Sequence, residues 1–233
     1  MLDKILEKLD CQKTIQLTEE EEKIILNSIT KEDFIACGSS RAVYRLNDNY
    51  VVKVAMAQGG VNQNKIEVDF YDRFGDYGYF AHLYAYGTMI NVMEALDDCA
   101  FYDEDDWGFY ESDDADASES DSYFSMLDIA SAVASLTGYD GADNGQIGYS
   151  NIRDAHVLYD YGYSDDYDRD EIVDSVGDWM PYVDPIQNAL EVLETGELLD
   201  CESFDQKIRQ TRQTKIKVND DTRYYNEEGD FYD

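Results

Sequence analysis

Basic side chains are nearly missing from the middle of this 233-residue sequence. No lysine lies between Lys65 and Lys207, and residues 94–200 hold 30 acidic and 2 basic side chains, a net charge of 2 − 30 = −28. The flanks are nearly balanced, with 14 acidic and 10 basic residues in 1–93 and 8 and 6 in 201–233. This deficit argues against direct binding of nucleic acid, which depends on lysine and arginine at the phosphates. A regional charge of one sign predicts a surface that meets a basic partner.

Proline, cysteine and histidine are also scarce. The two prolines argue against proline-rich linkers, and the two histidines supply a zinc site poorly. The four cysteines show no paired spacing, which suits free thiols in a reducing compartment. No apolar run approaches membrane-spanning length, and the charged residues 1–10 do not resemble a signal peptide. We therefore expect a soluble, cytoplasmic protein with no membrane contact.

The apolar content is sufficient for a folded core. Hydrophobic residues make up 43% of the sequence, with 20 tyrosines and 9 phenylalanines, which argues against wholesale disorder. The periodicity predicts helices within residues 1–33, and Thr18 is the expected N-cap of the second helix. The next expected elements are a hairpin of strands over 34–46 and 50–56, a helix over 64–74, and two strands within 80–96.

The second half of the sequence is dominated by acidic residues. Residues 97–122 form an acidic stretch of low complexity, for which we expect loops or helix ends. Residues 207–233 hold a basic patch, followed by a polar end that is expected to fray. The patch consists of Lys207, Arg209, Arg212, Lys215 and Lys217. The other expected elements are helices over 125–138, 170–179 and 184–199, and one short strand within 154–163.

Two motifs in the first half carry candidate chemistry. Gly38, Ser39 and Ser40 end one expected strand, where small residues let backbone N–H groups approach a phosphate, although an ordinary hairpin edge has the same composition. Lys53 lies within an apolar strand. A buried lysine requires an anion, and Glu67 on the following helix is the natural partner. An outward-facing Lys53 is the plainer alternative.

Two further motifs lie at the ends of expected strands. Glu94 stands in the sequence Met-Glu-Ala-Leu, and Asp160 is followed by Tyr161 and Gly162. The carboxylate of Asp160, at the end of its strand, is an oxygen ligand suited to Mg²⁺. A plain strand-to-turn junction also has an aspartate and a glycine.

The order of these motifs from Phe34 to Gly162 resembles the protein-kinase-like fold, and most of all the small, divergent kinase-like proteins of bacteriophages. The resemblance implies an α+β fold with two lobes, an antiparallel-sheet N-lobe and a small helical, acidic C-lobe. If the chain is encoded by a phage, it is expected in the host cell cytoplasm. The implied domains are a helical extension (1–33), the N-lobe (34–96), the C-lobe (97–206) and a basic-then-acidic tail (207–233).

The resemblance also implies roles for the motif residues. In an active kinase, Lys53, Glu67 and Asp160 would take part in phosphotransfer, and Asp140 would orient the substrate hydroxyl. Mg-ATP is the possible cofactor, with the metal on Asp160. The residues expected to hold the nucleotide are Gly38, Ser39, Ser40 and Glu94. The segment from Met93 to Leu96 resembles the kinase hinge, whose backbone would hold the adenine base.

The region around Asp140 departs from the kinase pattern. A kinase has an asparagine five residues after its catalytic aspartate, whereas Asn144 and Gln146 lie four and six residues after Asp140. No His-Arg-Asp precedes, and nothing after Tyr163 resembles Ala-Pro-Glu. We therefore predict a catalytically inactive pseudokinase. The alternative is an active, ATP-dependent kinase of phage type that acts on basic substrates.

The acidic residues indicate how an inactive protein would act. At one charge per ~1.7 Å of duplex, about 28 charges correspond to roughly 50 Å of DNA. This composition is similar to that of phage antirestriction and anti-CRISPR proteins that mimic DNA. We predict that the acidic surface inhibits a basic nucleic-acid-binding protein of the host, of the bacterial defence type. General solubility or adaptation to salt is the plainer alternative. The expected contact residues are Asp103, Glu104, Asp105, Asp106, Glu111, Asp113, Asp114, Asp116, Asp165, Asp166, Asp168 and Asp170.

Overall fold

The computed structural model describes residues 1–10, 13–38, 40–97, 126, 128–129, 147–161 and 183–222. Its centre is a six-stranded sheet with the order β1-β5-β6-β4-β3-β2, in which β1 and β5 pair in parallel and the other neighbours pair antiparallel. This mixture of sheet and helices confirms the predicted α+β class. The strands of the sheet are β1 (Ile15–Gln16), β2 (Phe34–Cys37), β3 (Arg41–Arg45), β4 (Tyr50–Ala55), β5 (Leu83–Tyr86) and β6 (Ile90–Glu94).

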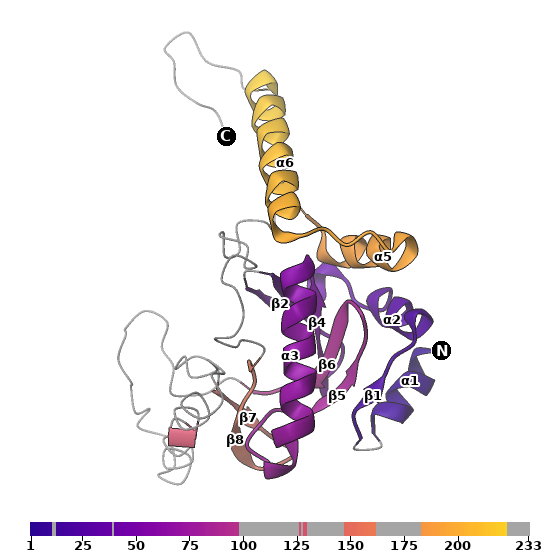
Figure 1. Cartoon of the computed structure of the whole chain (residues 1–233), viewed down its shortest axis with the longest axis vertical. Helices are drawn as coiled ribbons and strands as arrows, with labels where there is room; N and C mark the ends of the chain where they lie inside the picture. Colours follow the sequence, from indigo (N-terminus) through magenta and orange to yellow (C-terminus); the bar gives the residue numbers. More distant parts are fainter. Residues whose placement is uncertain are drawn as a thin grey trace.

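A second hairpin and several helices surround this sheet (Figure 1). The hairpin consists of β7 (Ile147–Ser150) and β8 (Ala155–Leu158). The helices are α1 (Leu2–Leu9), α2 (Glu19–Leu26), α3 (Gln58–Phe74), α5 (Pro185–Thr195) and α6 (Cys201–Thr222), with short 3₁₀ turns η1 (Lys31–Asp33) and η2 (Gly75–Tyr77). None of the helices within the described ranges is long and apolar enough to cross a membrane.

Local sequence signals set the ends of these helices. Thr18 caps α2 as expected: its hydroxyl accepts from the Glu21 N–H, and the Glu21 carboxylate accepts from the Thr18 N–H. Asp184 caps α5 just before Pro185, and Gly196 ends that helix with a positive φ of 71°.

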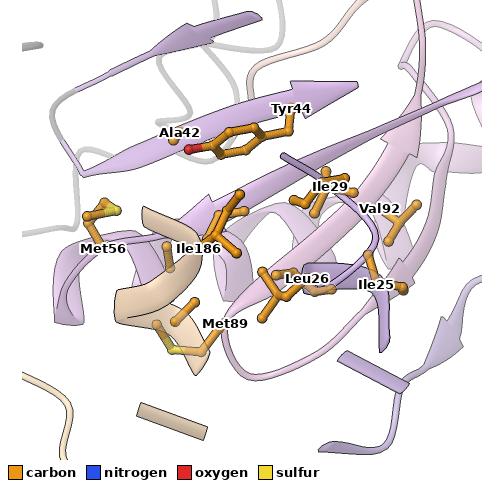
Figure 2. Close-up of a cluster of buried hydrophobic side chains, with 14 of the residues drawn as sticks. Ile25, Leu26, Ile29, Ala42, Tyr44, Met56, Met89, Val92 and Ile186 are labelled. Carbon is orange, nitrogen blue, oxygen red and sulfur yellow. The ribbon is translucent and has the colours of Figure 1, made fainter. Parts of the chain in front are cut away.

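One face of the sheet packs against α1, α2, α5 and the start of α6. Alternation along β3, β4 and β6 places Tyr44, Val52 and Val92 on this face. They share a continuous core with apolar residues of the helices, among them Ile25, Leu26, Ile186 and Phe204 (Figure 2). Residues 183–211 therefore belong to the same core as the N-terminal half of the chain.

The opposite face is covered by α3, which lies across the strands (Figure 1). Phe70 of α3 and Met93 of β6 lie in a second core together with Val157 and Leu158 of the β7–β8 hairpin. The hairpin also joins the body through backbone hydrogen bonds, from the Ala81 N–H to the Leu158 carbonyl (2.7 Å) and from the Asp97 N–H to the Tyr149 carbonyl (3.0 Å).

The helix α3 approaches the sheet unusually closely at Gly60. A Cβ on Gly60 would lie 2.3 Å from the Ser40 carbonyl oxygen and 3.1 Å from the Ala55 Cα. Both are backbone atoms, so no side chain can move aside. The glycine therefore fixes the distance between α3 and β4.

The observed elements differ from the expected ones at several places. The strand expected over 34–46 is two strands, because Gly38 begins a turn in which its N–H donates to the Arg41 carbonyl. The helix expected over 64–74 begins at Gln58. The strand β7 was not predicted. Residues 207–222 are helical as part of α6, which starts by burying Phe204 and Ile208. The end that is expected to fray extends into residues 223–233, which lie outside the described residues.

The two-lobe arrangement stays a prediction. Of residues 98–146 and 162–182, which would form most of the acidic lobe, only Met126, Asp128 and Ile129 lie among the described residues. The two described cysteines, Cys37 and Cys201, are free thiols, as their spacing predicted.

We expect Gly60→Ala to lower the free energy of unfolding by about 1–3 kcal/mol, because the added methyl group forces α3 away from the sheet. Urea denaturation measures this loss. Gly38→Ala is the matched control, since a Cβ there meets nothing within 4 Å, and its effect should stay within about 0.5 kcal/mol. Equal stability of the two variants would contradict the close packing of α3.

Candidate functional site

Strand alternation brings polar side chains together on the face beneath α3. Lys53 on β4 pairs in register with Val43 on β3 and with Asn91 on β6. Arg41 lies two residues before Val43 and therefore points to the same face of the sheet. Glu67, in the middle of α3, faces these groups and is completely buried, with 0% of its side chain exposed.

Three donors satisfy the Glu67 carboxylate. The Lys53 Nζ donates to Oε1 at 2.5 Å, which is the ion pair expected from the sequence. The Arg41 Nη1 lies 2.9 Å from Oε2, and the Asn91 Nδ2 donates to the same oxygen at 3.0 Å. A carboxylate is buried at tolerable cost only with such partners on both oxygens.

Asp160 adds a second carboxylate from the end of β8. The Arg41 Nη2 donates to its Oδ1 at 2.7 Å, and the Lys53 Nζ lies 3.5 Å from the same atom. The Lys53 Nζ also donates to the Tyr159 carbonyl at 2.9 Å. Arg41, Lys53, Glu67 and Asp160 form one group of two cations and two anions, which we name the ion cluster.

The residue after Asp160 fixes the direction of its carboxylate. Tyr161 is buried, its hydroxyl donates to the Ala81 carbonyl at 3.0 Å, and its ring packs against Phe70 and Phe80. Because Tyr161 is anchored in the core and Tyr159 is bonded through its carbonyl, Asp160 is held toward Arg41.

The two cations of the cluster keep Asp160 ionised. Burial opposes ionisation of this carboxyl, but the charges of Lys53 and Arg41 outweigh the opposition and lower its pKa to about 2. Burial likewise opposes the charge on Arg41, and the Glu67 and Asp160 carboxylates more than compensate and raise the pKa of the guanidinium.

Two asparagines complete the surroundings of the cluster. The Arg41 Nη1 lies 3.4 Å from the Asn64 Oδ1. The Asn64 Nδ2 donates to the Met89 carbonyl at 3.3 Å, and the Asn91 Nδ2 donates to the Asn64 carbonyl at 3.1 Å. These bonds tie α3 to β6 beside the ion pairs.

In the expected nucleotide-binding loop, the described residues Gly38 and Ser40 form hydrogen bonds with other residues of the protein. The Gly38 N–H donates to the Arg41 carbonyl at 2.9 Å, and the Ser40 hydroxyl donates to the Gln63 Oε1 at 2.7 Å. The Ser40 carbonyl accepts from the Met56 N–H at 2.9 Å. Ser39 lies outside the described residues.

Glu94, which is expected beside the base of a nucleotide, forms hydrogen bonds with other residues of the core. Its buried carboxylate accepts from the His82 N–H at 3.1 Å and from the Ser150 hydroxyl. Its own N–H donates to the His82 carbonyl at 2.8 Å, and the Ala95 N–H donates to the Asn49 carbonyl at 2.9 Å. Glu94 thus links β6 to the β7–β8 hairpin.

Asp140 and the twelve expected partner-binding residues lie outside the described residues. The structure therefore unites Lys53, Glu67 and Asp160, and places Glu94 elsewhere in the core. Within the described ranges, no group of three or more histidine, cysteine, aspartate or glutamate side chains is placed to hold a metal ion.

Arg41 is the member of the cluster that sequence reasoning missed. An arginine beside two serines is typical of an exposed turn. The available signal was its spacing: Arg41 lies two residues before Val43, on the same face as a lysine already expected to be buried. Chemically, the cluster holds a guanidinium between two carboxylates.

Comparison of the sequence with models of known protein families and with curated proteins gives no match.

Loss of the Asp160 charge should be visible in the pH dependence of stability. The folded pKa of about 2 is below the ordinary 3.8, so Asp160 stabilises the fold above about pH 4, and this contribution is lost as the pH falls toward 2. Asp160→Asn should therefore be less stable than the wild type at pH 7, and the gap should narrow between pH 4 and pH 2. Urea midpoints across this range measure the gap; a constant gap would contradict the lowered pKa.

Proposed function

We propose that this chain is a kinase-like protein that transfers no phosphate, and that it binds a basic nucleic-acid-binding protein through its acidic residues, in place of DNA. The observation that carries the proposal is the contact between the Arg41 Nη2 and the Asp160 Oδ1, at 2.7 Å. The kinase resemblance assigns the metal to Asp160, and this oxygen already accepts from a cation of the protein itself.

The pair of Lys53 and Glu67 does not separate an active kinase from an inactive one, because active kinases have the same pair. Arg41 favours an inactive protein. Glycine-rich loops that cover ATP end in Gly-x-Val, and Arg41 stands at the corresponding position before Val43. Its guanidinium lies 2.7 Å from the Asp160 Oδ1, so it competes with a metal ion for that oxygen.

The charge of the chain also favours a protein partner over a nucleotide. Residues 94–200 carry a net charge of 2 − 30 = −28, which repels polyphosphate and accelerates association with basic proteins. The ten basic residues within 1–93 distinguish this pattern from adaptation to salt, which would spread acidic residues over the whole chain. A regional excess of acid supports a specific contact surface.

The binding proposal is tested by competition for a basic protein. A labelled duplex of about 15 base pairs, which carries about as many phosphates as the acidic region has excess charges, is bound to a purified restriction endonuclease or nucleoid protein. We expect the wild type to displace the duplex from at least one of these probes. Its own Kd for that probe, measured without DNA, should rise about tenfold or more from about 50 to 200 mM NaCl. Fluorescence anisotropy reports the displacement.

Charge reversal locates the contact. Changing Asp103, Glu104, Asp105 and Asp106 to lysine should abolish displacement. The matched control reverses four exposed acidic residues of the N-terminal half, namely Asp3, Glu20, Glu32 and Asp48. Equal displacement of the duplex by the two variants would contradict the proposal that these acidic residues form the contact.

An active kinase is the second candidate, because Lys53, Glu67 and Asp160 do converge. Thermal unfolding with Mg-ATP separates the candidates. A ligand at ~100-fold excess over its Kd adds about 2.7 kcal/mol, a shift of roughly 5–10 °C for a chain of this size. We expect no shift beyond that given by Mg²⁺ alone. A nucleotide-dependent shift that Lys53→Met removes would favour the kinase.

A further inference from the structure

The Arg41 guanidinium lies among oxygens of three residues. Its Nη2 is 2.7 Å from the Asp160 Oδ1, and its Nη1 is 2.9 Å from the Glu67 Oε2 and 3.4 Å from the Asn64 Oδ1. Two carboxylates and an amide carbonyl are the ligand set that hard divalent cations prefer. The site therefore has the ligands of a metal centre and already holds a cation.

We propose that this is a divalent-cation site filled by the chain's own Arg41, and that a shorter, neutral residue at position 41 converts it into a site for Mg²⁺ or Mn²⁺. The inference deepens the proposed function and rests on it, because it names the group that keeps a metal from Asp160. Position 41 thus determines whether the cluster depends on a bound ion.

The charges of the cluster support this exchange. With Arg41 and Lys53 opposite Glu67 and Asp160, the formal sum is zero. Removal of the guanidinium leaves a net charge of −1 around the fully buried Glu67, so the vacated position attracts a cation. Asp160 is 38% exposed, so water can complete the coordination of an ion, as Mg²⁺ and Mn²⁺ require.

Because the residue in the proposed cation site is an arginine, the site stays occupied. A guanidinium does not lose its proton in proteins, and here its charge is further stabilised by two carboxylates. The side chain is only 8% exposed. A change of pH or of metal concentration therefore does not empty the site.

The experiment compares wild type, Arg41→Gln and the double variant Arg41→Gln/Asp160→Asn, each in EDTA and in Mn²⁺ without nucleotide. All three proteins share the other acidic residues of 94–200, which give the same background of weak Mn²⁺ binding. About 0.3 M NaCl screens these charges. We expect Arg41→Gln to have a lowered Tm in EDTA, and Mn²⁺ at ~100-fold excess over its Kd to raise that Tm by roughly 5–10 °C. Electron paramagnetic resonance should count one more bound Mn²⁺ in Arg41→Gln than in the other two proteins.

Two results would overturn the proposal: the same Mn²⁺ response in all three proteins, or an Arg41→Gln variant that does not fold with Mn²⁺ present. Folding only with Mn²⁺ would support it, since the metal then replaces the lost charge. The experiment contains no nucleotide and no partner, so a failure of the metal site is distinguishable from a failure of the proposed function.

Discussion

The burial of Glu67 is the constraint on which the rest of the structure depends. A carboxylate with no exposed area must be neutralised where it lies, and its two cations come from neighbouring strands, Arg41 from β3 and Lys53 from β4. A slip of either strand by one residue would turn its cation to the other face. The ion cluster therefore fixes the register of the sheet, and Gly60 sets the distance at which α3 delivers the carboxylate.

Asp160 extends this dependence to the β7–β8 hairpin. Its bond to Arg41 and the buried Tyr161 hold the chain after β8 against α3 and the sheet. Three parts of the fold thus meet in one neutral group of charges. Within it, the charges of Arg41 and Lys53 balance those of Glu67 and Asp160.

Much of this arrangement follows from patterns in the sequence. Alternation of apolar residues located the central strands, and the buried lysine of β4 indicated its partner on α3. Arg41 was not predicted, because its role depends on the turn at Gly38, which divides one expected strand into two. Glu94 was assigned to a nucleotide because its neighbours resemble a kinase hinge, whereas only tertiary contacts with His82 and Ser150 explain its burial. The acidic stretch 97–122 has a biased composition without periodicity, so no helix or strand could be derived for it.

The hydrogen bonds between Asp97 and Tyr149 have a consequence for how the acidic region can change in evolution. Each residue's N–H donates to the other's carbonyl, at 3.0 and 3.1 Å, so the two ends of the segment 98–148 are fastened at the same point of the scaffold. Within this segment, Met126 is buried in the second core. The entropic cost of closing such an insertion grows only slowly with its length, by about 0.6 kcal/mol per doubling. Changes of length or charge at positions of this segment other than Met126 would leave its two ends at that point, so the same scaffold could carry segments of different length and charge.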